Sequence, residues 1–213
     1  MGLIFSLSIF IFGLLLLLFN TVCFGLLKPK SKKTKILSYY LLASFIEGTI
    51  CFSLYFVFQL NNFFLSHIFF NLQMLFLSYF FYNIFESKKV QQFIKFSVLV
   101  LILVFAVQYI LNPAAFFKFN LYEIVSVCVL LIMLALLNIY YTLGQSKRFF
   151  YFSIGVIVYF TCTCLVYLLG GYTIILCKNP LIDHWIIKDV FFIIFQVLVF
   201  KEYNYLKLNR SAN

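Results

Sequence analysis

The chain has 213 residues, of which 65% are hydrophobic, 22% aromatic and only 10% charged, and its mean hydropathy is +1.07. So little polar surface cannot cover a water-soluble domain, and we expect an all-α, polytopic membrane protein instead. The net charge of +10 does not indicate nucleic-acid binding, because the basic residues gather in short segments between apolar runs, where membrane topology accounts for them.

The apolar runs have the length that a membrane crossing requires. A hydrocarbon core of about 30 Å takes about 20 residues of helix, and the breaks in the sequence divide it into seven such runs. The predicted spans cover residues 3–26, 36–60, 63–85, 94–111, 121–142, 149–170 and 185–203. They predict a single transmembrane domain, residues 1–213, built as a seven-transmembrane-helix bundle that contacts the lipid bilayer on its outside.

Lysine and arginine fall almost entirely on one side of this predicted topology. Thirteen of the sixteen are Lys28, Lys30, Lys32, Lys33, Lys35, Lys88, Lys89, Lys95, Lys147, Arg148, Lys201, Lys207 and Arg210, and only Lys118 and Lys178 fall in the opposite loops. Short cytoplasmic loops retain basic residues, so we expect the N-terminus outside and the C-terminus in the cytoplasm. The basic residues between spans, Lys28, Lys30, Lys32, Lys33, Lys35, Lys88, Lys89, Lys147 and Arg148, would then meet anionic lipids or a cytoplasmic protein partner.

The second run, "ILSYYLLASFIEGTICFSLYFVFQL", contains one carboxylate, Glu47. An ionisable side chain within the hydrocarbon is costly, and each such residue is therefore a functional hypothesis. Glu47 lies eleven residues after Ile36, about 17 Å along a helix and close to the middle of the predicted span. Tyr40, Ser44 and Cys51 recur on its face at spacings of three or four, which predicts a polar face directed into the bundle.

The third run brings further polar residues to the same layer. His67 and Asn71 share one helical stripe, and Gln73 matches Glu47 in predicted depth. A hydrogen bond between Gln73 and Glu47 is therefore expected. Two interpretations stay open: a ligand or ion site, or an interhelical hydrogen bond that only specifies packing.

The fifth and seventh runs carry charged residues near their outer ends. Glu123 is two residues into the fifth span, and Lys188 and Asp189 lie one turn into the seventh. With His67 they predict an outward-facing polar vestibule above Glu47. The alternative is a set of interfacial ion pairs that fix the order of the helices.

Signatures of enzymes and metal sites are missing from the sequence. Two histidines, His67 and His184, cannot form a three-histidine zinc site, and the six cysteines show no C-x-x-C spacing. G-x-S-x-G and H-E-x-x-H are also missing. We therefore expect no metal and no cofactor, assign no catalytic residue, and favour a protein that is not an enzyme.

Three stretches carry a resemblance to a known group: "NNFFLSHIFFNLQMLFLSYFFY" (61–82), "RFFYFSIGVIVYFTCTCLVYLL" (148–169) and "HWIIKDVFFIIFQVLVF" (184–200). Through them the chain resembles uncharacterised seven-span bacterial integral membrane proteins, akin to the membrane-embedded sensor regions of histidine kinases. In that group the first stretch carries Asn-Asn, a His and, six residues later, a Glu. Asn61, Asn62 and His67 match this pattern, and Gln73 replaces the Glu.

The last stretch of the group reads Trp-Ile-Ile-His, and here Lys188 follows Trp185, Ile186 and Ile187 in place of the His. The resemblance implies a sensory or accessory module in the bacterial inner (cytoplasmic) membrane. It implies no particular ligand.

The first functional hypothesis is a non-enzymatic module that binds a small ligand, lipid or ion and signals to a cytoplasmic partner. Its candidate binding residues are Glu47, His67, Asn71, Gln73, Glu123, Lys188 and Asp189. One alternative is a channel or transporter subunit, assembled as a homo-oligomer, with a cation or proton path through Glu47 and Asp189. Others are a lipid-directed enzyme that uses His67, Glu47 and Asp189, and an accessory subunit whose polar groups only specify packing.

Overall fold

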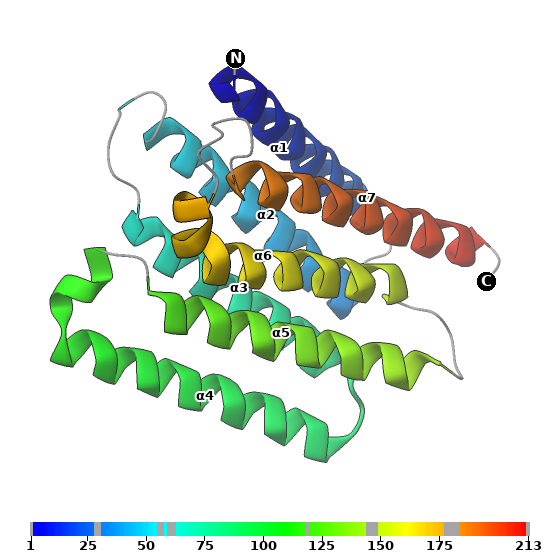
Figure 1. The fold of residues 1–213 in the computed structure, drawn as a ribbon. Coiled ribbons are helices and arrows are strands. Elements are labelled where there is room, and N and C mark those ends of the chain that lie inside the picture. The colour runs from blue at the N-terminus through cyan, green and yellow to red at the C-terminus, as the bar shows by residue number, and fades with distance from the viewer. Residues whose placement is uncertain are drawn as a thin grey trace. The chain divides into compact units, whose positions relative to one another are not determined.

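The computed structural model describes residues 2–27, 31–54, 58, 63–117, 120–143, 149–176 and 184–211, and every regular element in this part of the chain is helical (Figure 1). The elements are α1 (Gly2–Leu26), α2 (Lys32–Phe52), α3 (Phe63–Ile84), α4 (Lys88–Leu111), the 3₁₀ helix η2 (Pro113–Phe117), α5 (Leu121–Thr142), α6 (Phe150–Leu176) and α7 (His184–Ser211). The all-α prediction is confirmed.

Six of the described helices, α1 to α6, are long and apolar enough to cross a membrane. The chain is therefore a multi-pass membrane protein by the length and composition of its helices. In α7 the charged residues interrupt the apolar run, since only eleven residues separate Asp189 from Lys201. That stretch spans about 17 Å, which is shorter than the hydrocarbon core.

Helix α2 ends earlier than the sequence predicts, at Phe52 instead of residue 60. The Thr49 and Ser53 hydroxyls each donate to the carbonyl oxygen four residues earlier, Phe45 O and Thr49 O, at 2.8 Å. Such bonds compete with the main-chain ladder and often bend helices. Helix α4 begins six residues before its predicted span and α7 continues beyond residue 203, because helix-forming polar residues flank both apolar runs.

The helices group into two compact units. Unit 1 comprises Met1–Lys28 and Ala135–Asn213, unit 2 comprises Pro29–Leu134, and the boundary falls within α5. The single transmembrane domain over residues 1–213 stays a prediction.

In unit 1, α7 packs against both α1 and α6 (Figure 1). A Cβ atom built on Gly13 of α1 would lie 3.1 Å from Phe192, and one on Gly155 of α6 only 2.7 Å from Phe195. The glycines thus let α7 approach both neighbours closely. Buried Asn20 of α1 donates from Nδ2 to the carbonyl oxygen of Gln196 at 2.8 Å and to its Oε1 at 3.0 Å.

The start of α6 is held by a carboxylate from α7. Oε1 of Glu202 accepts the Phe149 N–H at 2.6 Å, and Oε2 accepts the N–H groups of Tyr151 at 3.0 Å and Phe152 at 3.4 Å. These are the donors that an α-helix leaves without a partner at its N-terminus. Glu202 is fully buried, so the cap also ties α6 to α7.

In unit 2, α3 contacts α2, α4 and η2. Its core side chains Met74, Leu77 and Phe81 are fully buried. Lys32 at the start of α2 lies 5.6 Å above the Tyr79 ring, and Lys95 of α4 lies 5.0 Å above Tyr82. Both tyrosines are close to the end of α3, so α3 runs antiparallel to both neighbours, and unit 2 gathers lysines at one end.

Candidate functional site

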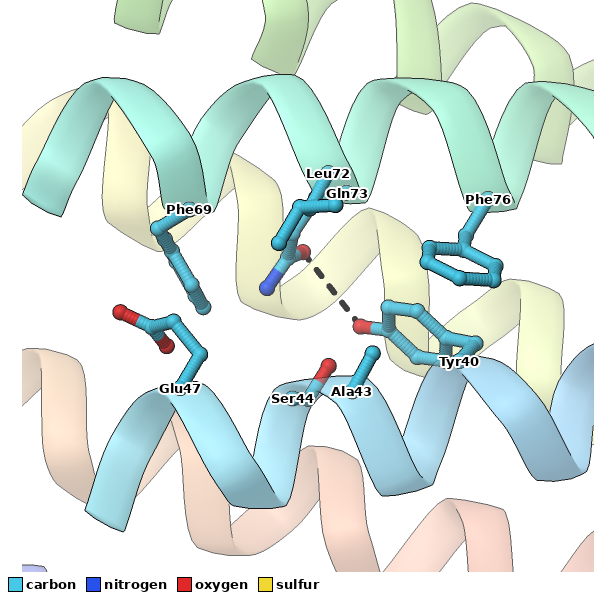
Figure 2. Close-up of a pocket in the computed structure, with 8 residues that line it drawn as sticks. All are labelled: Tyr40, Ala43, Ser44, Glu47, Phe69, Leu72, Gln73 and Phe76. Atoms are coloured by element: carbon cyan, nitrogen blue, oxygen red, sulfur yellow. Dashed lines mark hydrogen bonds between the residues drawn. The ribbon is translucent and has the colours of Figure 1, made fainter. Parts of the chain in front are cut away.

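Glu47 lies at a small cavity between α2 and α3 (Figure 2). The cavity is lined by Tyr40, Ala43, Ser44 and Glu47 of α2 and by Phe69, Leu72, Gln73 and Phe76 of α3. The residues of α2 recur at spacings of three and four, which places them on one helical face. The predicted polar face of the second run is therefore the face that meets α3.

The polar groups of this cavity contact one another. The Tyr40 hydroxyl donates to Oε1 of Gln73 at 3.4 Å, and both side chains are buried. The Cys51 thiol, one turn beyond Glu47, donates to Glu47 Oε1 at 2.9 Å. Figure 2 shows Glu47, Ser44 and Tyr40 along α2 opposite the Gln73 amide. The expected hydrogen bond between Gln73 and Glu47 stays a prediction, and the partner that the structure gives Gln73 is Tyr40.

The size of the cavity restricts what it can hold. Its volume is ≈ 10 Å³, which is about the space that one water molecule needs. Sites for organic ligands usually enclose about 300–1,000 Å³. The cavity is thus suited to a single water molecule or a monatomic ion.

The position of Glu47 along its helix differs from the expectation. It lies five residues before Phe52, the last residue of α2, and so about 8 Å from that end of the helix. The apolar run in the sequence continues to residue 60 and predicts a position near the middle of the span. Because α2 is shorter, Glu47 belongs to its last third.

A second polar cluster lies on the opposite face of α3. His67 and Asn71 of α3 meet Glu123 of α5 and Tyr109 of α4. Oε2 of Glu123 lies 2.7 Å from Nδ1 of His67 and also accepts the Tyr109 hydroxyl, while Oε1 accepts Nδ2 of Asn71 at 2.5 Å. The Tyr109 oxygen lies 2.9 Å from Nδ1 of His67. We name these four residues and Asn120 the His67 cluster.

The hydrogen atoms of the His67 cluster can be counted. The Tyr109 hydroxyl has one hydrogen, and Glu123 accepts it. Nδ1 of His67 donates to a nearby oxygen in the tautomer that carries its hydrogen on Nδ1. The Glu123 carboxylate thus contacts three polar side chains, those of His67, Tyr109 and Asn71.

The surroundings close the cluster. His67 and Glu123 are buried, and Phe116 of η2 stacks on the His67 ring with centroids 5.3 Å apart. The cluster therefore ties α3, α4, η2 and α5 together, and its polar atoms already satisfy one another. The Glu47 carboxylate differs in position, since it lies at the wall of a cavity.

Tyr109 and Asn120 are members of the cluster that the sequence analysis missed. Asn120 donates to the Tyr109 oxygen at 3.2 Å and accepts the Glu123 N–H at 3.4 Å. A usable signal existed, because Asn120 followed three residues later by Glu123 matches a helix-capping pattern at the start of α5. Tyr109 carried no such signal, since a tyrosine near a span end is typical of the interfacial belt.

The remaining candidate residues lie elsewhere. Lys188 and Asp189 are half-buried in α7 of unit 1, and the vestibule that would join them to His67 and Glu123 stays a prediction. Lys32, Lys35, Lys88 and Lys89 are exposed at the starts of α2 and α4, and Lys33 is half-buried. Lys28, Lys30, Asn61, Asn62, Lys147 and Arg148 lie outside the described residues.

Comparisons with known proteins give no further assignment, because no family model, curated protein or solved structure matches the chain. Within the part of the chain that the structure describes, no group of three or more His, Cys, Asp or Glu residues could hold a metal ion.

Proposed function

We propose that the protein is a non-enzymatic sensory module of a bacterial inner membrane, which binds a monatomic ion at the α2–α3 cavity and passes the change to its cytoplasmic face. One observation carries the proposal: the carboxylate of Glu47 lies at a cavity between two helices, together with the polar side chains of Tyr40, Ser44 and Gln73.

The proposed topology has seven spans, with the N-terminus outside and the C-terminus in the cytoplasm. Support for the seventh span comes from unit 1, where α7 lies along two apolar helices. The pairs Gly13 with Phe192, Asn20 with Gln196 and Phe24 with Tyr203 advance together along α1 and α7. A helix that follows a membrane-crossing neighbour in parallel for this distance is expected to cross with it, and the basic residues support the orientation.

The antiparallel pair α2 and α3 offers a route from the cavity to the lysine-rich end of unit 2. Tyr40 and Gln73 join the two helices on the side of the cavity that faces this end. Lys32 and Tyr79 join them again beyond it. A ligand that binds one arrangement of α2 and α3 more tightly than another would increase the fraction of molecules in that arrangement.

Hydrogen–deuterium exchange of the full chain in lipid nanodiscs tests this proposal. Glu47→Gln removes the charge at the cavity. We expect the hydrogen-exchange rates of the main-chain amides of residues 32–37, at the other end of α2, to change. Ile46→Val is the matched control, because Ile46 adjoins Glu47 on the same helix and is 50% exposed. Equal exchange at residues 32–37 in both variants and in the native chain would refute sensing.

A channel or transporter subunit is the second candidate, because the same small cavity suits an ion in transit. Cation and proton flux into proteoliposomes separates the two functions. Flux that disappears in Glu47→Ala would establish the transport function. A sensor would show none above empty liposomes.

A further inference from the structure

Phe149, the residue directly before α6, has a left-handed main-chain conformation with a φ of 62°. Among the residues that the structure describes, it is the only one with a positive φ. This conformation brings the Cβ atom of an L-residue close to the following carbonyl oxygen, so it is unfavourable for a bulky side chain. Such a residue keeps its conformation only where the surrounding contacts hold it.

Contacts from three helices hold Phe149 on both sides of its main chain. Its N–H donates to Oε1 of Glu202 in α7 at 2.6 Å. Its carbonyl oxygen accepts the Ser153 hydroxyl of α6 at 3.0 Å, and Nδ2 of Asn138 in α5 donates to that hydroxyl oxygen at 2.8 Å. All four residues are buried. The conformation of Phe149 therefore depends on α5, α6 and α7 together.

Glu202 is the one member of this network whose side chain can gain or lose a charge. As a carboxylate it accepts the N–H groups of Phe149, Tyr151 and Phe152. A charged acceptor forms stronger hydrogen bonds than a neutral one. Protonation removes the charge and places a hydrogen on one of the two oxygens, so the bonds to these N–H groups weaken.

The helices around Glu202 offer no buried cation in the part of the chain that the structure describes. Helix α1 and the unit 1 part of α5 contain no charged residue. Lys201 and Lys207 of α7 are exposed, and Nζ of Lys201 lies 5.8 Å above the ring of Tyr151. The other titratable groups near this end of unit 1 are Cys23 of α1, the exposed Tyr140 and Tyr141 of α5, and Tyr203 and Tyr205 of α7. The three N–H groups are thus the partners that the structure shows for the charge of Glu202.

We propose that Glu202 is a proton-sensitive latch for the start of α6. In its charged form it holds Phe149 in the left-handed conformation. Once protonated, it releases Phe149, which relaxes toward the right-handed region that bulky residues prefer. The latch lies in unit 1 and does not depend on the Glu47 cavity. In the proposed topology the start of α6 is at the cytoplasmic face, so the latch responds to cytoplasmic pH.

A single NMR signal can report on the latch in the full chain in lipid nanodiscs. Arg148 precedes Phe149, and the other arginine, Arg210, precedes Ser211. Labelling Arg with ¹³C at the carbonyl and Phe with ¹⁵N therefore selects one amide, that of Phe149. Stepwise acidification should move its amide proton upfield in a single reversible transition, because a charge-assisted hydrogen bond is lost.

Hydrogen exchange at the first turn of α6 shows whether protonation also releases the helix. Across the same transition, we expect the protection factors of the amides of residues 149, 151 and 152 to fall by about tenfold or more. In Glu202→Gln the Phe149 signal should lie upfield at every pH, without a transition. Glu86→Gln is the control, because Glu86 is an exposed carboxylate of unit 2, and it should titrate as the native chain does.

Three outcomes would overturn the proposal. The Phe149 signal does not respond to pH, it responds equally in Glu202→Gln, or it responds without any loss of protection at residues 149–152. If Glu202→Gln does not fold, Glu202→Asp takes its place, because its shorter side chain should change the midpoint of the transition. An unchanged midpoint in Glu202→Asp would assign the transition to another group and so refute the latch.

Discussion

At the scale of single residues, unit 2 uses its polar side chains in two different ways. In the His67 cluster the carboxylate of Glu123 makes short contacts with His67, Asn71 and Tyr109. The Glu47 carboxylate instead lines a cavity and accepts the Cys51 thiol. We therefore expect substitutions in the first cluster to affect stability and substitutions in the second to affect ligand binding.

Tyr109→Phe tests the stabilising role of the His67 cluster. The change removes a donor to Glu123 and an acceptor for Asn120, so a buried carboxylate loses a partner. We expect the free energy of unfolding to fall by about 1–3 kcal/mol, measured by denaturant titration in lipid nanodiscs. Tyr122→Phe is the control, because Tyr122 is 80% exposed, and it should change stability by less than about 0.5 kcal/mol. Equal values for the two variants would contradict the assignment.

At the scale of the helices, contacts distant in sequence decide where the elements begin and how closely they pack. Helix α6 begins where Glu202, about fifty residues later, accepts its first N–H groups. Helix α3 has two polar faces, one with Gln73 toward α2 and one with His67 and Asn71 toward α5. A helix with two such faces belongs in the interior of its unit.

Glu202→Gln tests the cap of α6. The carboxamide retains one acceptor oxygen and places an NH₂ group where the second oxygen accepts from Tyr151 and Phe152. We expect a loss of about 1–3 kcal/mol in the free energy of unfolding and faster hydrogen exchange in the first turn of α6. Glu86→Gln changes an exposed carboxylate and should alter neither. Unchanged exchange at residues 149–152 in Glu202→Gln would show that the cap does not determine where α6 begins.

Two glycines of unit 1 test the packing of α7. Gly155→Ala places a Cβ atom 2.7 Å from the fully buried Phe195 ring, so the ring must shift, at a cost of about 1–3 kcal/mol. Gly25→Ala meets nothing within 4 Å and should stabilise α1 by up to about 1 kcal/mol. Thermal unfolding of the two variants measures the difference. A Gly155→Ala variant as stable as Gly25→Ala would show that α6 and α7 are not in close contact at this point.

At the scale of the whole molecule, the number of crossings determines on which side of the membrane each terminus lies. Seven spans place the termini on opposite sides, whereas the six helices α1 to α6 alone would place both on the same side. We expect a tag at the N-terminus to be accessible from outside intact cells and one at the C-terminus to be protected until the membrane is opened. If both tags are accessible from the same side, α7 does not cross the membrane.

The amino-acid sequence by itself determined the membrane class, the helical architecture and the approximate position of most helices. These depend on local properties, since an apolar run of about 20 residues must satisfy its main-chain hydrogen bonds as a helix within a bilayer. It also singled out Glu47, because a carboxylate in such a run is conspicuous wherever it faces. The end of α2 at Phe52 was harder to predict from the sequence, because Thr and Ser hydroxyls compete with the main chain inside a run that is otherwise apolar.

Only the tertiary structure decided which polar residues meet. Helical periodicity shows which side chains share a face, but it does not show which helix packs against that face. No local pattern in the sequence therefore predicted three of the contacts. They are Tyr40 with Gln73, Tyr109 with Glu123, and Glu202 with the start of α6. The space left beside Glu47 has the same origin, because its volume depends on how closely α2 and α3 approach.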